Sequence, residues 1–146
     1  MNLDDILDEW SRDCEIGHNL ESTSRDTPKL HGKYLGYLTQ AKLILKRAED
    51  KQHLLLKDKF LWYNGKLSQE DTERHNWEPD PFDGLKVMKS DLNYWYESDP
   101  DIQASEAKIV YYKNMVDTLK DIVDAIKWRH QHIRNIIEIR KFEAGA

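Results

Sequence analysis

The sequence predicts an all-α protein made of long helices, and three observations favour this fold class. Only 6 glycines and 4 prolines occur in 146 residues, so few positions interrupt a helix. Charged residues make up 34% of the chain and hydrophobic residues 39%, which is typical of long helices with one buried stripe. Apolar residues recur at steps of three and four in several long stretches, and no stretch alternates as a half-buried strand does.

The first helix is predicted to begin after Asn2 and to end near Gly17. Asparagine is a favoured N-cap residue, and Asp4 and Asp5 then face the positive end of the helix dipole. The apolar residues of this helix share one face: Leu3, Ile6, Leu7, Trp10 and Cys14. The polar segment 19–27 is expected to be a loop.

A second helix is predicted to start at Thr27 and Pro28 and to run to Tyr63, because threonine caps a helix and proline suits its first turn. Asn64 and Gly65 tolerate positive φ and are expected to end it. The apolar stripe of this helix consists of Tyr34, Leu38, Ala41, Leu45, Ala48 and Leu55.

The segment 66–84 is acidic and carries Pro79 and Pro81 without any helical or strand period. We expect a long loop there, or a partly disordered one. A short amphipathic helix is predicted within 85–96, because Leu85, Met88 and Leu92 recur at helical spacing.

The last helix is predicted to span 99–142, again with a capping residue before a proline, and to be roughly 60 Å long. Its heptad seam is the predicted oligomerisation surface and consists of Ile109, Tyr112, Val116, Leu119, Val123, Ile126, His130, Ile133 and Ile137. The apolar face is wider than a two-stranded coiled coil needs, so other helices of the chain, copies of this helix, or both must cover it. A 17.4 kDa chain of long stripes buries little core alone, which favours self-association.

The chain is therefore interpreted as one structural domain with three segments. Residues 1–66 form an N-terminal helical region with a basic helix, residues 67–98 an acidic loop with a short helix, and residues 99–146 an oligomerisation helix. A lone cysteine suits a reducing cytosol, and no signal peptide or membrane-spanning run is expected.

Charge is distributed unevenly along the chain, although the net charge is only −5. Residues 1–28 carry −6, residues 29–66 carry +6, residues 67–107 carry −8, and residues 108–146 carry +3. One long basic segment between two acidic ones keeps a nucleic-acid partner possible despite the overall negative charge.

The stretch 57–66 combines lysines with aromatic residues at the end of the basic helix. Single-stranded nucleic acid is bound by this combination, because cations contact phosphates and aromatic faces stack on bases. The candidate single-stranded-DNA-binding residues are Lys57, Lys59, Trp62, Tyr63, Lys66, Lys46 and Arg47. The ordinary alternative is a helix end whose lysines complement the dipole and whose aromatic residues belong to the core.

Neither an enzyme nor a cofactor or metal site is predicted. His130 and His132 point to different sides of a helix, and Glu15 with His18 supplies only part of a di-iron motif. The sequence has no phosphate-cradling glycine loop and no supported nucleophile–histidine arrangement.

Three stretches resemble the UvsY family, the recombination mediators of T-even-type phages. The terminus Arg140-Lys141-Phe142-Glu143-Ala144-Gly145 is similar to the family's Arg-x-Phe-Glu-Ala-Gly, and 124–129 is similar to its Asp-Ala-Ile-Lys-x-Arg. The family's Leu-Lys-x-Arg-Leu-x-Tyr-Tyr-x-Gly is matched by 56–65, with lysine instead of arginine at position 59 and an aspartate at position 58.

This resemblance implies a non-catalytic, ring-like homo-oligomer, a hexamer or heptamer, in the cytoplasm of the infected bacterial host. It implies binding of single-stranded DNA during recombination, repair and replication. It also implies that the protein loads the phage recombinase onto strands covered by the phage single-strand-binding protein. The family's two basic DNA contacts fall on Lys57 and Lys59.

A second hypothesis remains open on the residues alone. A coiled-coil scaffold or adaptor without nucleic-acid binding has the same long helices, and it predicts no measurable single-strand binding at moderate salt.

Overall fold

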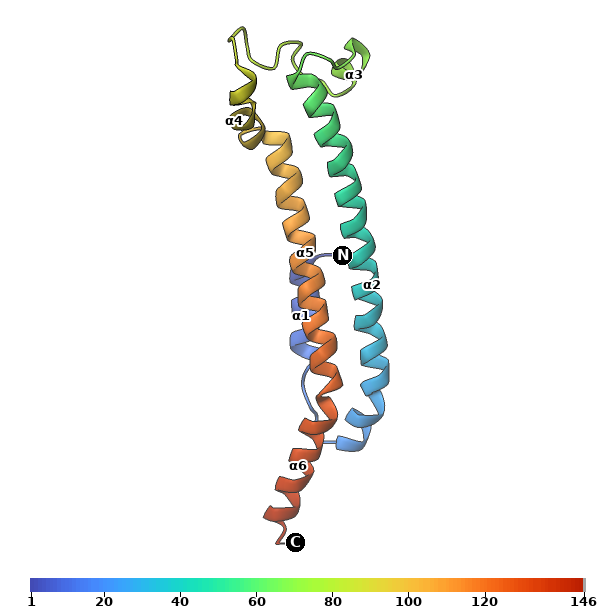
Figure 1. Ribbon diagram of the computed structural model, residues 1–146. Coiled ribbons are helices and arrows are strands. Elements are labelled where there is room, and N and C mark those ends of the chain that lie inside the picture. Colours follow the sequence, from blue (N-terminus) through green and yellow to red (C-terminus); the bar gives the residue numbers. More distant parts are fainter. Residues whose placement is uncertain (146) are drawn as a thin grey trace. The chain divides into compact units, whose positions relative to one another are not determined.

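The computed structural model describes residues 1–145, and all of its regular elements are helices (Figure 1). No residue in this described part lies in a β-strand, which confirms the predicted all-α class. Ala146, the last residue of the predicted C-terminal segment, lies outside the described residues. The elements are α1 (Leu3–Asp13), α2 (Leu20–Tyr63), α3 (Gln69–Arg74), the 3-10 helix η1 (Lys89–Asp91), α4 (Leu92–Glu97), α5 (Pro100–Lys127) and α6 (Arg129–Glu143).

The described chain divides into two compact units. The first contains Met1–Ile44 and residues 112–145, and the second contains Leu45–Tyr111. Both boundaries fall inside the long helices α2 and α5, so each of these helices contributes to both units.

Tyr34 is the centre of the first unit, where it is completely buried and its ring meets the edge of Trp10 at 5.4 Å. Its hydroxyl donates to Asp13 Oδ2 at 2.9 Å, and Lys33 Nζ lies 2.6 Å from the same oxygen. These contacts fix α1 against α2. The remaining core of this unit consists of Ile6, Leu38, Ala41, Met115, Val116, Leu119, Ile122, Val123, Ile126 and Ile133.

Local signals placed some helix ends correctly. The Asn2 side chain accepts from the Asp4 amide at 2.8 Å, which confirms the predicted N-cap. At the end of α2, Gly65 has φ 69°, and the Lys66 amide donates to the Leu61 carbonyl at 2.7 Å, as in a Schellman motif. Asp99 Oδ1 accepts from the Asp101 and Ile102 amides at 2.9 and 3.1 Å and so caps α5.

Two predicted ends in the N-terminal part were wrong. Helix α1 ends at Asp13, before Gly17, and α2 begins at Leu20, so most of the predicted loop 19–27 is helical. Asn19 provides the cap, because its side chain accepts from the Ser22 amide at 3.1 Å. Pro28 therefore lies inside α2 rather than at its start, and Figure 1 shows the first turns of α2 inclined to the rest, as expected for an internal proline.

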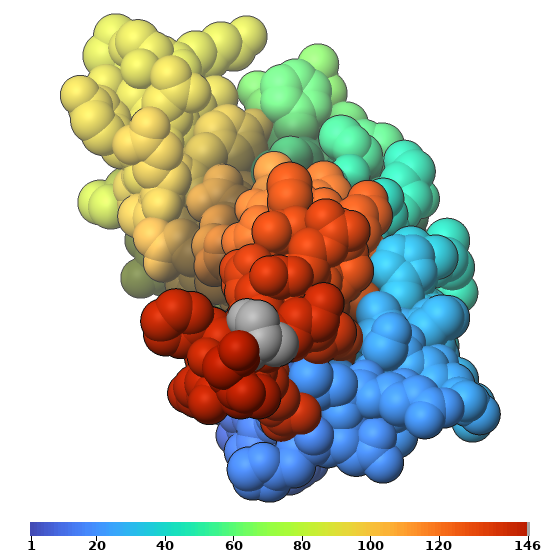
Figure 2. All heavy atoms as spheres, turned by 90° about the horizontal axis from the view of Figure 1, so that it is seen from below, coloured from blue at the N-terminus to red at the C-terminus, as the bar shows by residue number. Residues whose placement is uncertain are grey.

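The predicted single helix over 99–142 is also corrected, because it is interrupted at Trp128. The Trp128 amide is shared between the carbonyls of Asp124 and Ala125, and α6 starts at the next residue. Arg129 is buried, and its guanidinium donates to the carbonyls of Asp13, Cys14 and Glu15 at 3.0–3.4 Å. Figure 2 shows the red C-terminal segment beside the blue N-terminal one, consistent with these bonds.

The seam predicted for oligomerisation is largely covered within the chain itself. Six of its members are buried: Ile109, Val116, Leu119, Val123, Ile126 and Ile133. Tyr112 is half-buried, whereas His130 and Ile137 are exposed. The wide apolar face is thus used first to pack α5 and α6 in their own chain, and only its exposed remainder is open to a second copy.

The acidic connection is more ordered than predicted. Residues 66–84 contain α3, whose Ser68 cap accepts from the Asp71 amide at 3.1 Å, and the helix expected within 85–96 is reduced to η1 and α4. Ser68 with Asp71 is a capping-box spacing, so a sequence signal for α3 was present.

Candidate nucleic-acid interface

The candidate residues lie in the second unit, from Lys46 in α2 to Lys66 just after this helix. Lys57 is exposed over 63% of its side chain, and Lys66, Lys46 and Arg47 are also exposed. Lys46 pairs with Asp50 one turn away at 2.9 Å. Four of the seven predicted contacts therefore present their charge to solvent.

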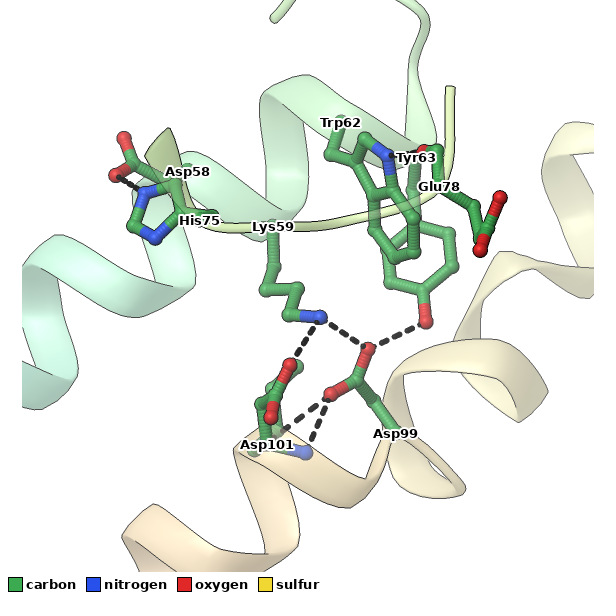
Figure 3. A network of polar contacts seen from close by, with 9 residues as sticks. Asp58, Lys59, Trp62, Tyr63, His75, Glu78, Asp99 and Asp101 are labelled. Carbon is green, nitrogen blue, oxygen red and sulfur yellow. Dashed lines mark hydrogen bonds and ion pairs between the residues drawn. The ribbon is translucent and has the colours of Figure 1, made fainter. Parts of the chain in front are cut away.

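Lys59 differs from these cations, because its side chain is only 2% exposed. Its Nζ lies 3.0 Å from Asp99 Oδ2 and 2.8 Å from Asp101 Oδ2, at the start of α5 (Figure 3). The same ammonium group lies 4.4 Å from the ring centre of Trp62 and 4.0 Å from that of Trp77. The prediction that Lys59 contacts DNA is therefore corrected: its charge is enclosed by α5 carboxylates and indole rings.

The predicted aromatic stacking residues are also part of the packing. Tyr63 is buried and donates to Asp99 Oδ2 at 2.5 Å, and its ring packs on Tyr96 at 5.0 Å. Trp62 is half-buried, packs on Trp77 at 5.2 Å, and donates from Nε1 to the Glu78 carbonyl at 2.8 Å. Tyr63 thus offers no open face to a base, and Trp62 offers at most part of one.

The Asp99 carboxylate connects these groups. It caps α5, pairs with Lys59 and accepts a hydrogen bond from Tyr63. Burial raises the pKa of Asp99, but hydrogen bonds from Tyr63, the Ile102 amide and Lys59 outweigh it and leave the pKa below its ordinary value. Burial and the bond to Asp99 raise the pKa of Tyr63. The α2 end is thus tied to the α5 start through the Asp99 carboxylate, whose lowered pKa keeps it ionised at neutral pH.

Acid is expected to weaken the fold, because the pKa values of Asp99, Asp13 and Glu9 are lowered in the folded state. Carboxylates of this kind stabilise the fold above their unfolded pKa of about 4, and the stabilisation is lost as pH falls through the folded pKa. Urea midpoints measured from about pH 6 to pH 3 should fall on acidification. The urea midpoint of Asp99→Asn should fall less steeply with acidification than that of wild type. Parallel curves of midpoint against pH for the two proteins would contradict the assignment to Asp99.

A contact that the sequence analysis missed lies on another side of α2. Asp58 Oδ2 is 2.8 Å from His75 Nε2, and the His75 ring stacks on Trp77 with centroids 4.0 Å apart. Figure 3 shows Asp58 directed to His75 while Lys59 points toward α5. The aspartate that interrupts the basic run therefore holds His75, the C-cap residue that follows α3.

Two further features bear on the function. Among residues 1–145, no group of three or more histidine, cysteine or acidic side chains is placed to hold a metal ion. Within the same described part, none of the helices is both long and apolar enough to cross a membrane.

Comparisons with known proteins agree on one family. The family model described as "Recombination, repair and ssDNA binding protein UvsY" matches residues 9–146. The recombination protein uvsY of Enterobacteria phage T4 is 25% identical over 146 residues, which covers 99% of each chain. Two crystal structures of the bacteriophage T4 recombination mediator protein UvsY share the fold.

The first of these structures has a TM-score of 0.76 at 23% identity, over 99% of this chain and 98% of its own. The second has a TM-score of 0.77 at 22% identity, over 98% and 99%.

Proposed function

This chain belongs to the UvsY family of recombination, repair and single-stranded-DNA-binding proteins, and we propose that it acts as a recombination mediator. The family is non-catalytic, so the function consists of binding and remodelling. The family match over residues 9–146 is the observation that carries this proposal.

The exposed cations of the second half of α2 and of the residues just after it support single-stranded-DNA binding. Lys46, Arg47, Lys57 and Lys66 all belong to one compact unit and present their charges to solvent. Phosphate contacts of this kind supply most of the affinity of proteins that bind single strands without sequence preference. One subunit offers few such contacts, so several copies must share a strand to bind it tightly.

Assembly as a homo-oligomer, a hexamer or heptamer, is part of the proposal. The exposed apolar residues Ile137, Ile139 and Phe142 of α6 support it, because exposed apolar side chains that gather on one short helix are typical of a protein–protein contact surface. In the cytoplasm of the infected host, the assembly would engage strands covered by the phage single-strand-binding protein and load the phage recombinase.

Lys57→Ala tests the DNA-binding site. We expect weaker binding of an oligothymidylate and a shallower salt dependence, because one phosphate contact changes affinity about 2.6-fold between about 50 and 200 mM salt. Fluorescence anisotropy over that salt range measures both quantities, and light scattering checks that the oligomeric state is unchanged.

Lys108→Ala is the matched control, since Lys108 is an exposed helical lysine of the same unit on α5. It should keep the salt slope of wild type. Equal slopes for Lys57→Ala and wild type would remove Lys57 from the site. A wild-type protein that binds no oligothymidylate at moderate salt would favour the scaffold hypothesis instead.

A further inference from the structure

A cleft between α2 and α3 gathers cations from two elements that are about twenty residues apart in sequence. It has a volume of about 520 Å³ and lies entirely in the second unit. Its lining residues include Lys51, Lys57 and Asp58 of α2, with Asp71, Arg74 and His75 of the α3 segment. Only Lys57 among these belongs to the predicted DNA-binding set.

Asp58 is the anchor that holds the two sides of the cleft together. Its carboxylate lies 2.8 Å from His75 Nε2. It also lies 3.9 Å from Arg74 Nη2 and 3.9 Å from Lys57 Nζ. Stacking of His75 on Trp77 fixes the α3 segment further. Arg74 and Lys57 thus lie near different oxygens of one carboxylate, Arg74 near Oδ2 and Lys57 near Oδ1.

Burial gives the mouth of the cleft a positive character. The carboxylate of Asp58 is only 13% exposed, whereas the side chains of Lys57 and Arg74 are 63% and 65% exposed. Asp71, the other lining carboxylate, forms an ion pair with Arg74 at 3.1 Å. Three cations of the lining, Lys51, Lys57 and Arg74, face two carboxylates, and the side chains of Lys57 and Arg74 are more exposed than those of Asp58 at 13% and Asp71 at 39%.

We propose that Arg74, together with Lys51 and Lys57, binds a backbone phosphate of single-stranded DNA in this cleft. The inference rests on the proposed function and adds to it a contact from the acidic connection. A guanidinium binds two phosphate oxygens through a rigid planar fork of N–H donors, whereas an ammonium group acts as a point charge without that geometry. Asp58 acts as a positioning residue, because it orients the α3 segment without offering charge to the strand.

This arrangement explains how the chain can bind a strand although Lys59 is enclosed. The second cation beside Lys57 is supplied by Arg74 from across the cleft rather than by Lys59 of α2. The acidic connection therefore contributes directly to the binding surface, despite its net negative charge.

The test is the salt dependence of oligothymidylate binding by Arg74→Ala, Arg74→Lys and wild type. A phosphate contact on a single strand contributes a slope of about 0.7 in log affinity against log salt for each engaged subunit. We expect Arg74→Ala to lose that amount and Arg74→Lys to keep the slope with a modest loss of affinity.

Arg25→Ala is the matched control, because Arg25 is also exposed and pairs with an acid one turn away, Glu21, but lies in the first unit. Arg25→Ala should keep the oligothymidylate affinity and the salt slope of wild type. If Arg74→Ala keeps the salt slope of wild type while Lys57→Ala weakens binding, Arg74 does not bind phosphate in this cleft. The proposed function would remain intact. If wild type binds no strand, both proposals fail together.

Discussion

Replacing Lys59 with methionine is expected to lower the free energy of unfolding by about 3–5 kcal/mol, because it leaves one member of a buried ion pair without its partner. Lys59 and Asp99 are each 2% exposed and lie 3.0 Å apart. The variant also loses the contacts of the ammonium group with the rings of Trp62 and Trp77. Urea unfolding followed by circular dichroism measures the change.

Lys57→Met is the matched control, since it makes the same substitution two residues earlier at an exposed position. Its effect should stay within about 0.5 kcal/mol, as for most surface substitutions. A double-mutant cycle of Lys59→Met with Asp99→Asn should show coupling, because the second change removes the orphaned charge. Equal stabilities of Lys59→Met and Lys57→Met would show that the enclosed pair is not important for the fold.

This result also decides how binding data are interpreted. A variant that carries both Lys57→Ala and Lys59→Ala would lose DNA affinity through damage to the α2 end as well as through a lost contact. Lys57→Ala alone separates the two effects, because Lys57 is exposed and its nearest acidic partner is Asp58 at 3.9 Å.

The burial of Lys59 was predictable in part from its position. The apolar stripe of α2 continues in steps of four from Leu55 through Lys59 to Tyr63, so helical spacing places the lysine on the packed side. What the sequence does not provide is the partner, because Asp99 lies 40 residues further along and is brought to Lys59 only by the fold. A lysine within a basic run is therefore easily assigned to a ligand when it serves an ion pair.

Helix ends show the same division between local and distant causes. Asn2, Asn64-Gly65 and Asp99-Pro100 were placed correctly because their hydrogen bonds involve residues within the same turns. The interruption at Trp128 has no such local signal. It accompanies the burial of Arg129, whose guanidinium satisfies carbonyls more than 110 positions earlier in the chain.

The largest effect on DNA affinity is expected from the exposed end of α6. Ile139 and Phe142 are 57% and 83% exposed, so replacing both with serine removes apolar surface without opening the core. If these residues join subunits, light scattering should show smaller particles, while the helical circular dichroism signal and melting temperature stay close to those of wild type.

Loss of assembly should then weaken oligothymidylate binding by about 100-fold to 10,000-fold, because a strand held by several linked sites gains that much over one site. The control replaces Leu43 and Val110 with serine, two apolar residues of α2 and α5 that are 54% and 55% exposed. Serine adds no charge, so neither variant changes the electrostatic attraction of the subunit for phosphate. If only the control variant dissociates, the interface between subunits does not lie on α6. An unchanged particle mass in both variants, with full DNA affinity, would contradict assembly through these apolar surfaces.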